Sequence, residues 1–263
     1  MNAVTSSDGV EIRFDRQGGG KPTLIFVHGW ANDRSIWDAQ AAHFSRNYEV
    51  INVDLPGFGD SGNNREEFTI ASFGGDIAAI VQALNLEQAV LIGFSMGAPV
   101  VIEAANRVPE QVIGVILVDD LHDVEATISP EEFGELESLY MELVENPTNE
   151  ALIGGGFYRN DADASFKRIF AMLEGAERIG WRESLLDAFN WQNEDCIESI
   201  SRVRAPIIAI NSDLQPTNVE AFREYSPSFQ AKIIPNTGHL VMWDAPEEFN
   251  HLLGETIQQL MSE

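Results

Sequence analysis

Residues 89–108, AVLIGFSMGAPVVIEAANRV, carry the clearest indication of the type of fold. It begins as an apolar strand and continues as a helix, and the two are joined at Gly93-Phe94-Ser95-Met96-Gly97, which matches the pattern G-x-S-x-G. A sharp turn between a strand and a helix strains the serine backbone and raises its hydroxyl above the sheet. Glycines two residues to either side avoid side chains that would clash in the turn. We therefore predict that Ser95 is a nucleophile and that Gly93 and Gly97 shape its turn.

Apolar strand-like segments alternate with helical ones along most of the chain, which is typical of a parallel sheet flanked by helices. The sequence thus predicts an α/β fold. From about residue 121 to 201 no strong strand pattern appears, and acidic, aromatic-rich helical patterns replace it. We expect residues 1–120 and 202–263 to form the core, and residues 121–201 to form a helical cap inserted before the last two strands. The expected strands include residues 23–27, 49–53, 89–95, 111–120, 205–213 and 230–239.

The composition narrows the class of partner. The 263 residues include 42 acidic and 16 basic ones, which gives a formal net charge of −26 at pH 7. Such a surface repels phosphate backbones and anionic lipid headgroups, so neither nucleic acid nor a membrane surface is an expected partner. A small molecule remains, and we expect a neutral or cationic substrate rather than a polyanion, with a neutral one favoured. No apolar face in the sequence predicts a dimer.

The sequence also favours a cytoplasmic location. Its single cysteine, Cys196, excludes an internal disulfide and suits a reducing compartment. No segment approaches the roughly 18 consecutive apolar residues that a membrane helix needs. The N-terminal residues lack the basic start and apolar run of a signal peptide.

A serine needs a base at neutral pH, and the chain offers five histidines. His239 ends the sequence Pro-Asn-Thr-Gly-His after the last predicted strand, where sheets of this kind place active-site residues. We predict that His239 is the base. His28 and His122 also follow predicted strands, so both remain possible neighbours of the site.

A third group must hold the base in its reactive tautomer. Asp213 ends the strand predicted at residues 205–213, and the segment from there to His239 has room for one helix and one strand. We predict that Asp213 orients His239. Asp119 and Asp120 end the preceding strand and are the alternatives, although such residues also cap and solvate strand ends.

The oxyanion formed by nucleophilic attack needs two N–H donors. One is expected from Met96, the residue after the nucleophile, and the other from Trp30, in the loop that follows the strand at residues 23–27. The Trp30 ring is expected to form a wall of the acyl pocket, with His28 and Gly29 as further pocket candidates. This set of residues calls for neither a cofactor nor a metal.

Together these motifs resemble the α/β-hydrolase superfamily over the whole chain. The likeness is strongest to its single-domain branch of small esterases, lactonases, carbon–carbon hydrolases and cofactor-free haloperoxidase-like enzymes. The oxyanion loop is similar at His28-Gly29-Trp30, the D-x-x-G-x-G-x-S turn at residues 54–61 and the nucleophile elbow at residues 93–97. Asp213 and His239 match the family's acid and base positions. The resemblance implies an eight-stranded, mostly parallel sheet under a helical cap that decides the substrate.

We therefore expect a serine hydrolase, carboxylesterase-like, that cleaves a carboxylic ester or lactone of a small neutral substrate through an acyl-enzyme on Ser95. Two alternatives stay open. Perhydrolysis, halide peroxidation or carbon–carbon bond hydrolysis is possible on the same scaffold, because a Trp30-containing oxyanion loop resembles that of the perhydrolase group. Otherwise the chain is a ligand-binding protein with a vestigial triad.

Overall fold

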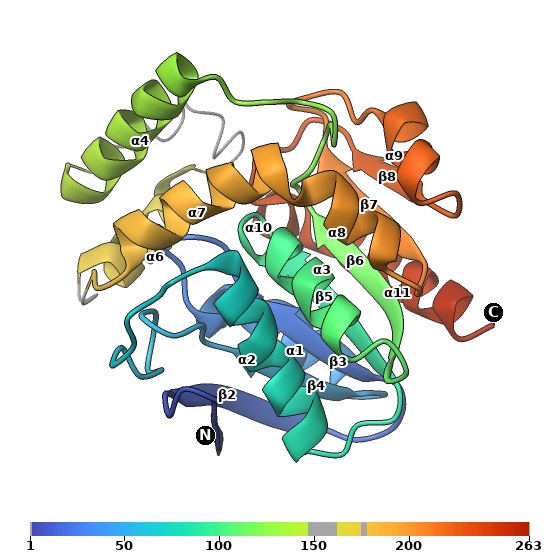
Figure 1. Ribbon diagram of the computed structural model, residues 1–263. Helices are drawn as coiled ribbons and strands as arrows, with labels where there is room; N and C mark the ends of the chain where they lie inside the picture. The colour runs from blue at the N-terminus through green and yellow to red at the C-terminus, as the bar shows by residue number, and fades with distance from the viewer. Residues whose placement is uncertain (1, 147–161, 175–177, 263) are drawn as a thin grey trace.

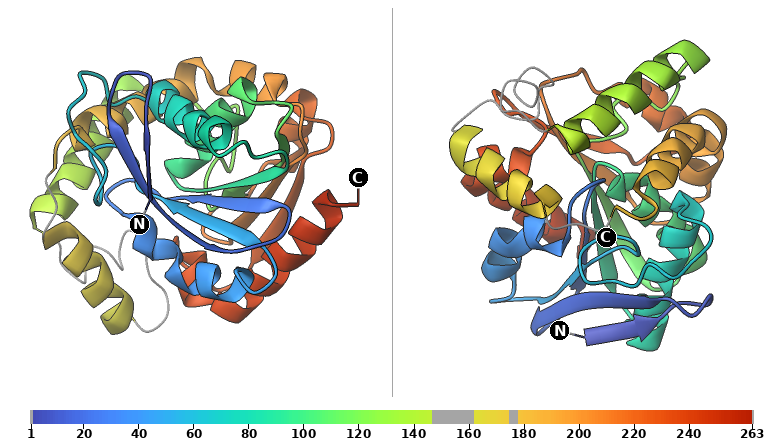
Figure 2. Two further views of the ribbon diagram at one scale, coloured as in Figure 1. Left: turned by 90° about the horizontal axis from the view of Figure 1, so that it is seen from below. Right: turned by 90° about the vertical axis from the view of Figure 1, so that its left-hand side faces the viewer.

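The computed structural model describes residues 2–146, 162–174 and 178–262, which form a twisted sheet with helices on both faces (Figure 1, Figure 2). Residues 147–161 and 175–177, which belong to the predicted cap, lie outside the described residues. The strands are β1 (Asn2–Thr5), β2 (Glu11–Gly18), β3 (Thr23–Val27), β4 (Glu49–Val53), β5 (Ala89–Phe94), β6 (Val112–Val118), β7 (Ile207–Ser212) and β8 (Gln230–Ile234).

These eight strands form one sheet in the order β1-β2-β4-β3-β5-β6-β7-β8. The pairs β1–β2 and β2–β4 are antiparallel, and every other neighbouring pair is parallel. The expected eight-stranded, mostly parallel sheet is therefore confirmed. Because the strands from β3 to β8 run in one direction, their carboxyl ends meet at one edge of the sheet, where such folds bind their ligands.

Helices cover both faces of the sheet, and further helices lie past the carboxyl ends of the parallel strands (Figure 1). Helices α2 and α3 lie on one face, with α8 packed against α3, whereas α1 and α11 lie together on the other (Figure 2). The helices are η1 (Arg34–Trp37, a 3-10 helix), α1 (Asp38–Phe44), α2 (Ile70–Ala83), α3 (Gly97–Arg107), α4 (Pro130–Glu145), α6 (Ala162–Glu174), α7 (Trp181–Glu194), α8 (Cys196–Arg202), α9 (Val219–Tyr225), α10 (Val241–Asp244) and α11 (Pro246–Leu260).

The region between β6 and β7 is helical, as expected. It contains α4, α6, α7 and α8 among the described residues, and we call it the β6–β7 helical segment. Figure 1 shows α4, α6 and α7 at the end of the sheet from which α3 starts. The helical segment therefore stands at the edge where the carboxyl ends of the parallel strands meet.

Aromatic packing beneath this edge ties several elements together. Trp37 is fully buried, and its ring contacts Phe26 of β3, Phe94 of β5 and Phe249 of α11, at centroid distances of 5.0, 6.3 and 6.1 Å. Large aromatic side chains bury much apolar surface and pack with specific geometry. Trp37 thereby packs the end of β5, where the G-x-S-x-G turn starts, against β3 and α11.

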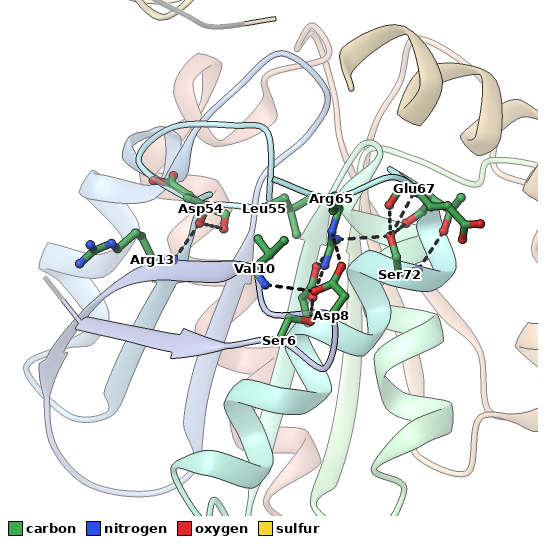
Figure 3. Close-up of polar contacts among 12 residues, drawn as sticks. Ser6, Asp8, Val10, Arg13, Asp54, Leu55, Arg65, Glu67 and Ser72 are labelled. Carbon is green, nitrogen blue, oxygen red and sulfur yellow. Dashed lines mark hydrogen bonds and ion pairs between the residues drawn. The ribbon is translucent and has the colours of Figure 1, made fainter. Parts of the chain in front are cut away.

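A buried ion pair fastens the N-terminal hairpin to the rest of the fold (Figure 3). Arg65 donates two hydrogen bonds to the carboxylate of Asp76 in α2, at 2.7 and 2.9 Å, and a third to Asp8 at 3.0 Å. The hydroxyl of Ser6 donates to the same Asp76 carboxylate. The side chains of Arg65 and Asp76 are only 2% and 0% exposed, so each depends on the other for its charge balance.

We predict that Arg65→Ala lowers the free energy of unfolding by about 3–5 kcal/mol, because it leaves the Asp76 carboxylate buried without a cation. Equilibrium unfolding in urea measures the change. The control is Arg204→Ala, which breaks an exposed pair with Glu110 and should leave the midpoint nearly unchanged. Equal effects of the two substitutions would contradict the role given to Arg65.

Within the described residues, no helix has both the length and the apolar character needed to cross a membrane.

Candidate active site

The turn after β5 has the strained geometry expected of a nucleophile elbow. Ser95 has a backbone φ of 50°, in the left-handed region that non-glycine residues rarely adopt, and its N–H donates to the carbonyl of Val118 at 3.0 Å. A Cβ atom on Gly93 would lie 2.1 Å from the Gly97 oxygen, and one on Gly97 would lie 2.7 Å from the Val27 oxygen. Close packing therefore leaves no room for a side chain at either glycine. The Ser95 side chain is partly exposed to solvent.

His239 lies beside this elbow, in the loop between β8 and α10. Its ring packs on the ring of Phe94, the residue before Ser95, with 4.7 Å between the centroids. The two residues before the histidine anchor the loop: Thr237 Oγ1 donates to the Ile234 carbonyl at 2.8 Å, and the Gly238 N–H donates to Asp244 Oδ2 at 2.6 Å. These contacts hold the His239 ring next to the residue that precedes Ser95.

The carboxylate paired with His239 belongs to Asp119. Asp119 Oδ2 lies 2.7 Å from His239 Nδ1, and Asp119 Oδ1 accepts the N–H of Ser212 at 2.6 Å. The Asp119 side chain is 1% exposed. Burial on its own raises the pKa of this carboxyl, but the hydrogen bonds from His239 and Ser212 outweigh burial and hold the pKa below its ordinary value. Asp119 is therefore an ionised acceptor for the Nδ1–H of His239.

The prediction that Asp213 orients His239 is corrected by this geometry. Asp213 is exposed just past the end of β7, and its Oδ1 accepts the backbone N–H of Asn236 at 3.1 Å. Asp213 thus supports the loop that carries His239, whereas Asp119, an alternative from the sequence, contacts the ring itself. Strands β6 and β7 are parallel neighbours, so their carboxyl ends reach the same edge, and spacing along the chain does not distinguish the two positions.

The oxyanion loop passes directly over the elbow. A Cβ atom on Gly29 would lie 3.0 Å from Ser95 Cβ, so the loop after β3 packs tightly against Ser95, the predicted nucleophile. Met96 follows Ser95 at the start of α3, where helix N–H groups lack partners within the helix. Among the described residues, the N–H groups of Trp30 and Met96 have no hydrogen-bond acceptor. Both donors are therefore available to an incoming oxygen.

His28 is buried and hydrogen-bonded to the backbone on both sides of its ring. Its side chain is fully buried, Nδ1 lies 2.7 Å from the Gly29 carbonyl oxygen, and Nε2 accepts the Leu55 N–H at 3.0 Å. Since Nε2 accepts, Nδ1 must carry the proton and donate to Gly29. Burial lowers the pKa of His28 and keeps it neutral. The expectation that His28 lines the pocket is therefore wrong, and its contact with Gly29 orients the oxyanion loop.

The turn at residues 54–61 supports the same loop. Asp54 is fully buried; its Oδ1 accepts the N–H of Arg34 at 2.7 Å and its Oδ2 accepts the N–H of Asp60 at 2.8 Å. The Arg34 guanidinium also pairs with Oδ2. A Cβ atom on Gly59 would lie 2.3 Å from the Asp54 carboxylate. Asp54 therefore links the loops that follow β3 and β4.

Trp30 connects the oxyanion loop to the β6–β7 helical segment. Its indole N–H donates to the carbonyl of Trp181 at 2.7 Å, and the Trp181 indole in turn donates to the Gly57 carbonyl at 3.1 Å. The Trp30 ring also meets Tyr140 of α4 edge to face, at a centroid distance of 5.4 Å. The aromatic side chains of the helical segment thus lie next to the expected oxyanion donor. Among the described residues, no group of histidine, cysteine and acidic side chains could hold a metal ion.

The chain belongs to the alpha/beta hydrolase family, whose model matches residues 24–252. It is 27% identical to the pimeloyl acyl-carrier protein methyl ester esterase of Yersinia enterocolitica, over 92% of this chain and 95% of that relative. Two other curated relatives are longer, and the match spans 30% and 46% of their lengths.

Solved structures share the fold across nearly the whole chain. A thermophilic esterase from Thermogutta terrifontis superposes with a TM-score of 0.81 at 23% identity, covering 98% of both chains. A bromoperoxidase from Bacillus anthracis superposes with a TM-score of 0.78 at 19% identity, covering 100% of both. At these identities the likeness concerns the fold, and the chemistry must be argued from the residues of this chain.

We predict that Asp119→Asn slows covalent labelling of Ser95 by a fluorophosphonate about 10⁴-fold, because asparagine keeps the shape of the side chain but holds His239 in the wrong tautomer. Asp213→Asn removes the same charge and retains an oxygen for Asn236, so its labelling rate should stay within about tenfold of the parent. The rates are measured by gel fluorescence over time. A larger loss in Asp213→Asn than in Asp119→Asn would restore the assignment made from the sequence.

Proposed function

We propose that the protein is a serine esterase that hydrolyses a carboxylic ester or lactone of a small molecule. The observation that carries this proposal is the pairing of His239 with the buried carboxylate of Asp119, beside a serine held in a strained turn. A nucleophile, a base and an orienting carboxylate that come from the ends of β5, β8 and β6, at one edge of the sheet, are the arrangement needed for acyl transfer.

The reaction would proceed in two steps. His239 removes the hydroxyl proton of Ser95 as its oxygen attacks the ester carbonyl, and Asp119 stabilises the resulting imidazolium through the Nδ1–H hydrogen bond. The N–H groups of Trp30 and Met96 bind the oxyanion. The imidazolium then protonates the leaving alcohol, which departs as the acyl-enzyme forms. In the second step His239 activates a water molecule, which releases the acid and restores Ser95.

The β6–β7 helical segment would act as the cap that selects the substrate. The contacts of Trp30 with Trp181 and Tyr140 support this role, because they bring the helical segment against the oxyanion loop. An acyl group bound to Ser95 would lie between these aromatic rings and the sheet edge. Residues 121–201 therefore form the unit whose exchange would be expected to change substrate preference.

Perhydrolysis or halide peroxidation is the second candidate. It is favoured by the position of Trp30 in the oxyanion loop and by the similarity of fold to the bromoperoxidase from Bacillus anthracis. In that chemistry hydrogen peroxide, rather than water, takes the acyl group from Ser95 and gives a peracid. Comparing acetate-dependent peroxide consumption with plain ester hydrolysis separates the two reactions.

We predict that the wild-type protein hydrolyses p-nitrophenyl esters and that Ser95→Ala lowers turnover on the order of 10⁶-fold, as removal of the nucleophile does in another serine hydrolase. Initial rates for acyl chains from acetyl to decanoyl give the activity and the preferred chain length. Ser138→Ala is a matched control, since Ser138 is exposed on α4 and its hydroxyl only bonds its own helix. An unchanged rate in Ser95→Ala would contradict the proposal, and a protein that binds esters without hydrolysing them would favour a ligand-binding role.

A further inference from the structure

The turn after β6 carries a second histidine, His122, which the mechanism above does not use. The backbone of this turn is left-handed at Asp119 and Leu121, with φ angles of 48° and 50°. Such angles are uncommon outside glycine and usually mark positions that the surrounding structure enforces. The chain thereby turns back on itself, and His122 Nε2 lies 3.7 Å from Asp119 Oδ1. The acid of the proposed triad therefore has a histidine beside each of its two oxygens.

The two histidines approach the Asp119 carboxylate differently. His239 Nδ1 lies 2.7 Å from Oδ2, which is a hydrogen bond, whereas the 3.7 Å between His122 Nε2 and Oδ1 makes that contact electrostatic. Oδ1 also accepts the N–H of Ser212 at 2.6 Å. Because the side chains of His122 and Asp119 are only 15% and 1% exposed, water screens the contact between them weakly.

The neighbours of His122 Nδ1 decide which ring nitrogen carries the proton. Thr217 Oγ1 and Asn211 Nδ2 lie 3.4 and 3.5 Å from this atom. Asn211 Nδ2 also donates to Thr217 Oγ1 at 3.0 Å, so the threonine hydrogen is free to point at Nδ1. An amide nitrogen donates and does not accept. Both neighbours therefore present donors to Nδ1, which places the ring proton on Nε2, beside Asp119.

The segment after β7 also holds the backbone of this turn. The Asn218 N–H donates to the His122 carbonyl at 2.7 Å, and the Asn218 side chain donates to Asp123 Oδ2 at 3.1 Å. Asn218 is itself fixed as the N-cap of α9, because its Oδ1 accepts the Ala221 N–H at 3.1 Å. Asn211, near the end of β7, is fully buried. The surroundings of His122 are thus built by β7 and the start of α9.

We propose that His122 is a positioning residue of the triad, whose Nε2–H steadies the Asp119 carboxylate so that its Oδ2 stays directed at His239. Thr217 and Asn211 hold the His122 ring in the tautomer that this role requires. The inference rests on the proposed esterase function and deepens it. In this account His122 acts through Asp119 and touches neither Ser95 nor the substrate.

The tautomer of His122 is measured by NMR that correlates the ring nitrogens with the carbon-bound ring protons, in alkaline buffer where histidine rings are neutral. The His122 signals are assigned by their loss in His122→Gln. We expect the proton on Nε2. Thr217→Val removes the hydroxyl that faces Nδ1 and should increase the share of the other tautomer. A parent protein with the His122 proton on Nδ1 would overturn the proposal, whether or not it hydrolyses esters.

The effect on the triad is measured by labelling Ser95 with a fluorophosphonate at several concentrations, which gives a maximal rate and a half-saturating concentration. We expect His122→Leu to lower the maximal rate about tenfold, the lower end of what a donor to a charged group contributes. The half-saturating concentration should stay unchanged, because the probe does not touch His122. His122→Gln can place an amide N–H near the position of Nε2 and should restore most of the lost rate.

The matched control is His251→Leu. It removes a histidine of α11 whose side chain is 64% exposed and pairs only with the exposed Glu255. This variant should be labelled at the parent rate. The urea unfolding midpoint of each variant is measured alongside, so that a loss of stability is separated from a loss of reactivity.

A double-mutant cycle tests whether Thr217 acts through His122. Thr217→Val alone should slow labelling, but by less than His122→Leu does, because the ring remains and only its fixed tautomer is lost. In the His122→Leu background the same substitution should have no further effect. Additive losses would show that Thr217 acts elsewhere and would contradict the role given to its hydroxyl.

Three labelling results would overturn the role of His122 while leaving the esterase function intact. The parent rate in His122→Leu means that Asp119 needs no second histidine. A raised half-saturating concentration at an unchanged maximal rate places His122 against the ligand instead. Equal losses in His122→Leu and His122→Gln, with lowered unfolding midpoints in both, mean that His122 serves folding alone. If the parent itself is not labelled, the esterase proposal fails, and the role of His122 in the triad fails with it.

Discussion

The strained backbone at Ser95 is the constraint on which the rest of the site depends. A non-glycine residue at φ 50° costs on the order of 1–3 kcal/mol, so the surrounding packing must impose it. Two features hold Ser95 in this conformation. There is no room for a side chain at Gly93 or Gly97, and the Ser95 N–H donates a hydrogen bond to the carbonyl of Val118 at the end of β6. The same close packing lets Gly29 approach Ser95, so the proposed nucleophile and the proposed oxyanion loop are positioned by one set of contacts.

Two adjacent carboxylates at the end of β6 have different surroundings. Asp119 accepts hydrogen bonds from His239 and Ser212, which favour its charged form despite burial. Asp120 accepts the N–H of Leu121, and burial raises its pKa. Pairs of titratable groups with divergent environments are characteristic of active sites. The surroundings of Asp119 suit the carboxylate that we propose to orient His239.

Local patterns in the sequence were sufficient for the fold. The alternation of buried strands with helices predicts the parallel sheet, and the G-x-S-x-G pattern predicts the turn at Ser95, because both depend on residues close together in the chain. The helical region between β6 and β7 was predictable for the same reason.

Contacts between distant segments were harder to predict. Asp119 and Asp213 both follow parallel strands that lie side by side, and only the left-handed turn at Asp119 directs its carboxylate to His239. His28 follows a strand in the same way, but its two hydrogen bonds bury it away from the pocket. The sequence shows that these residues reach one edge of the sheet, whereas the direction of each side chain depends on packing.

In the proposed reaction Ser95 is covalently acylated during turnover. Mass spectrometry of the protein, quenched within milliseconds of mixing with a p-nitrophenyl ester, measures this acylation. We expect a transient mass increase equal to one acyl group, mapped to the peptide that contains Ser95. Continued ester hydrolysis with no adduct, or with an adduct on another residue, would contradict it.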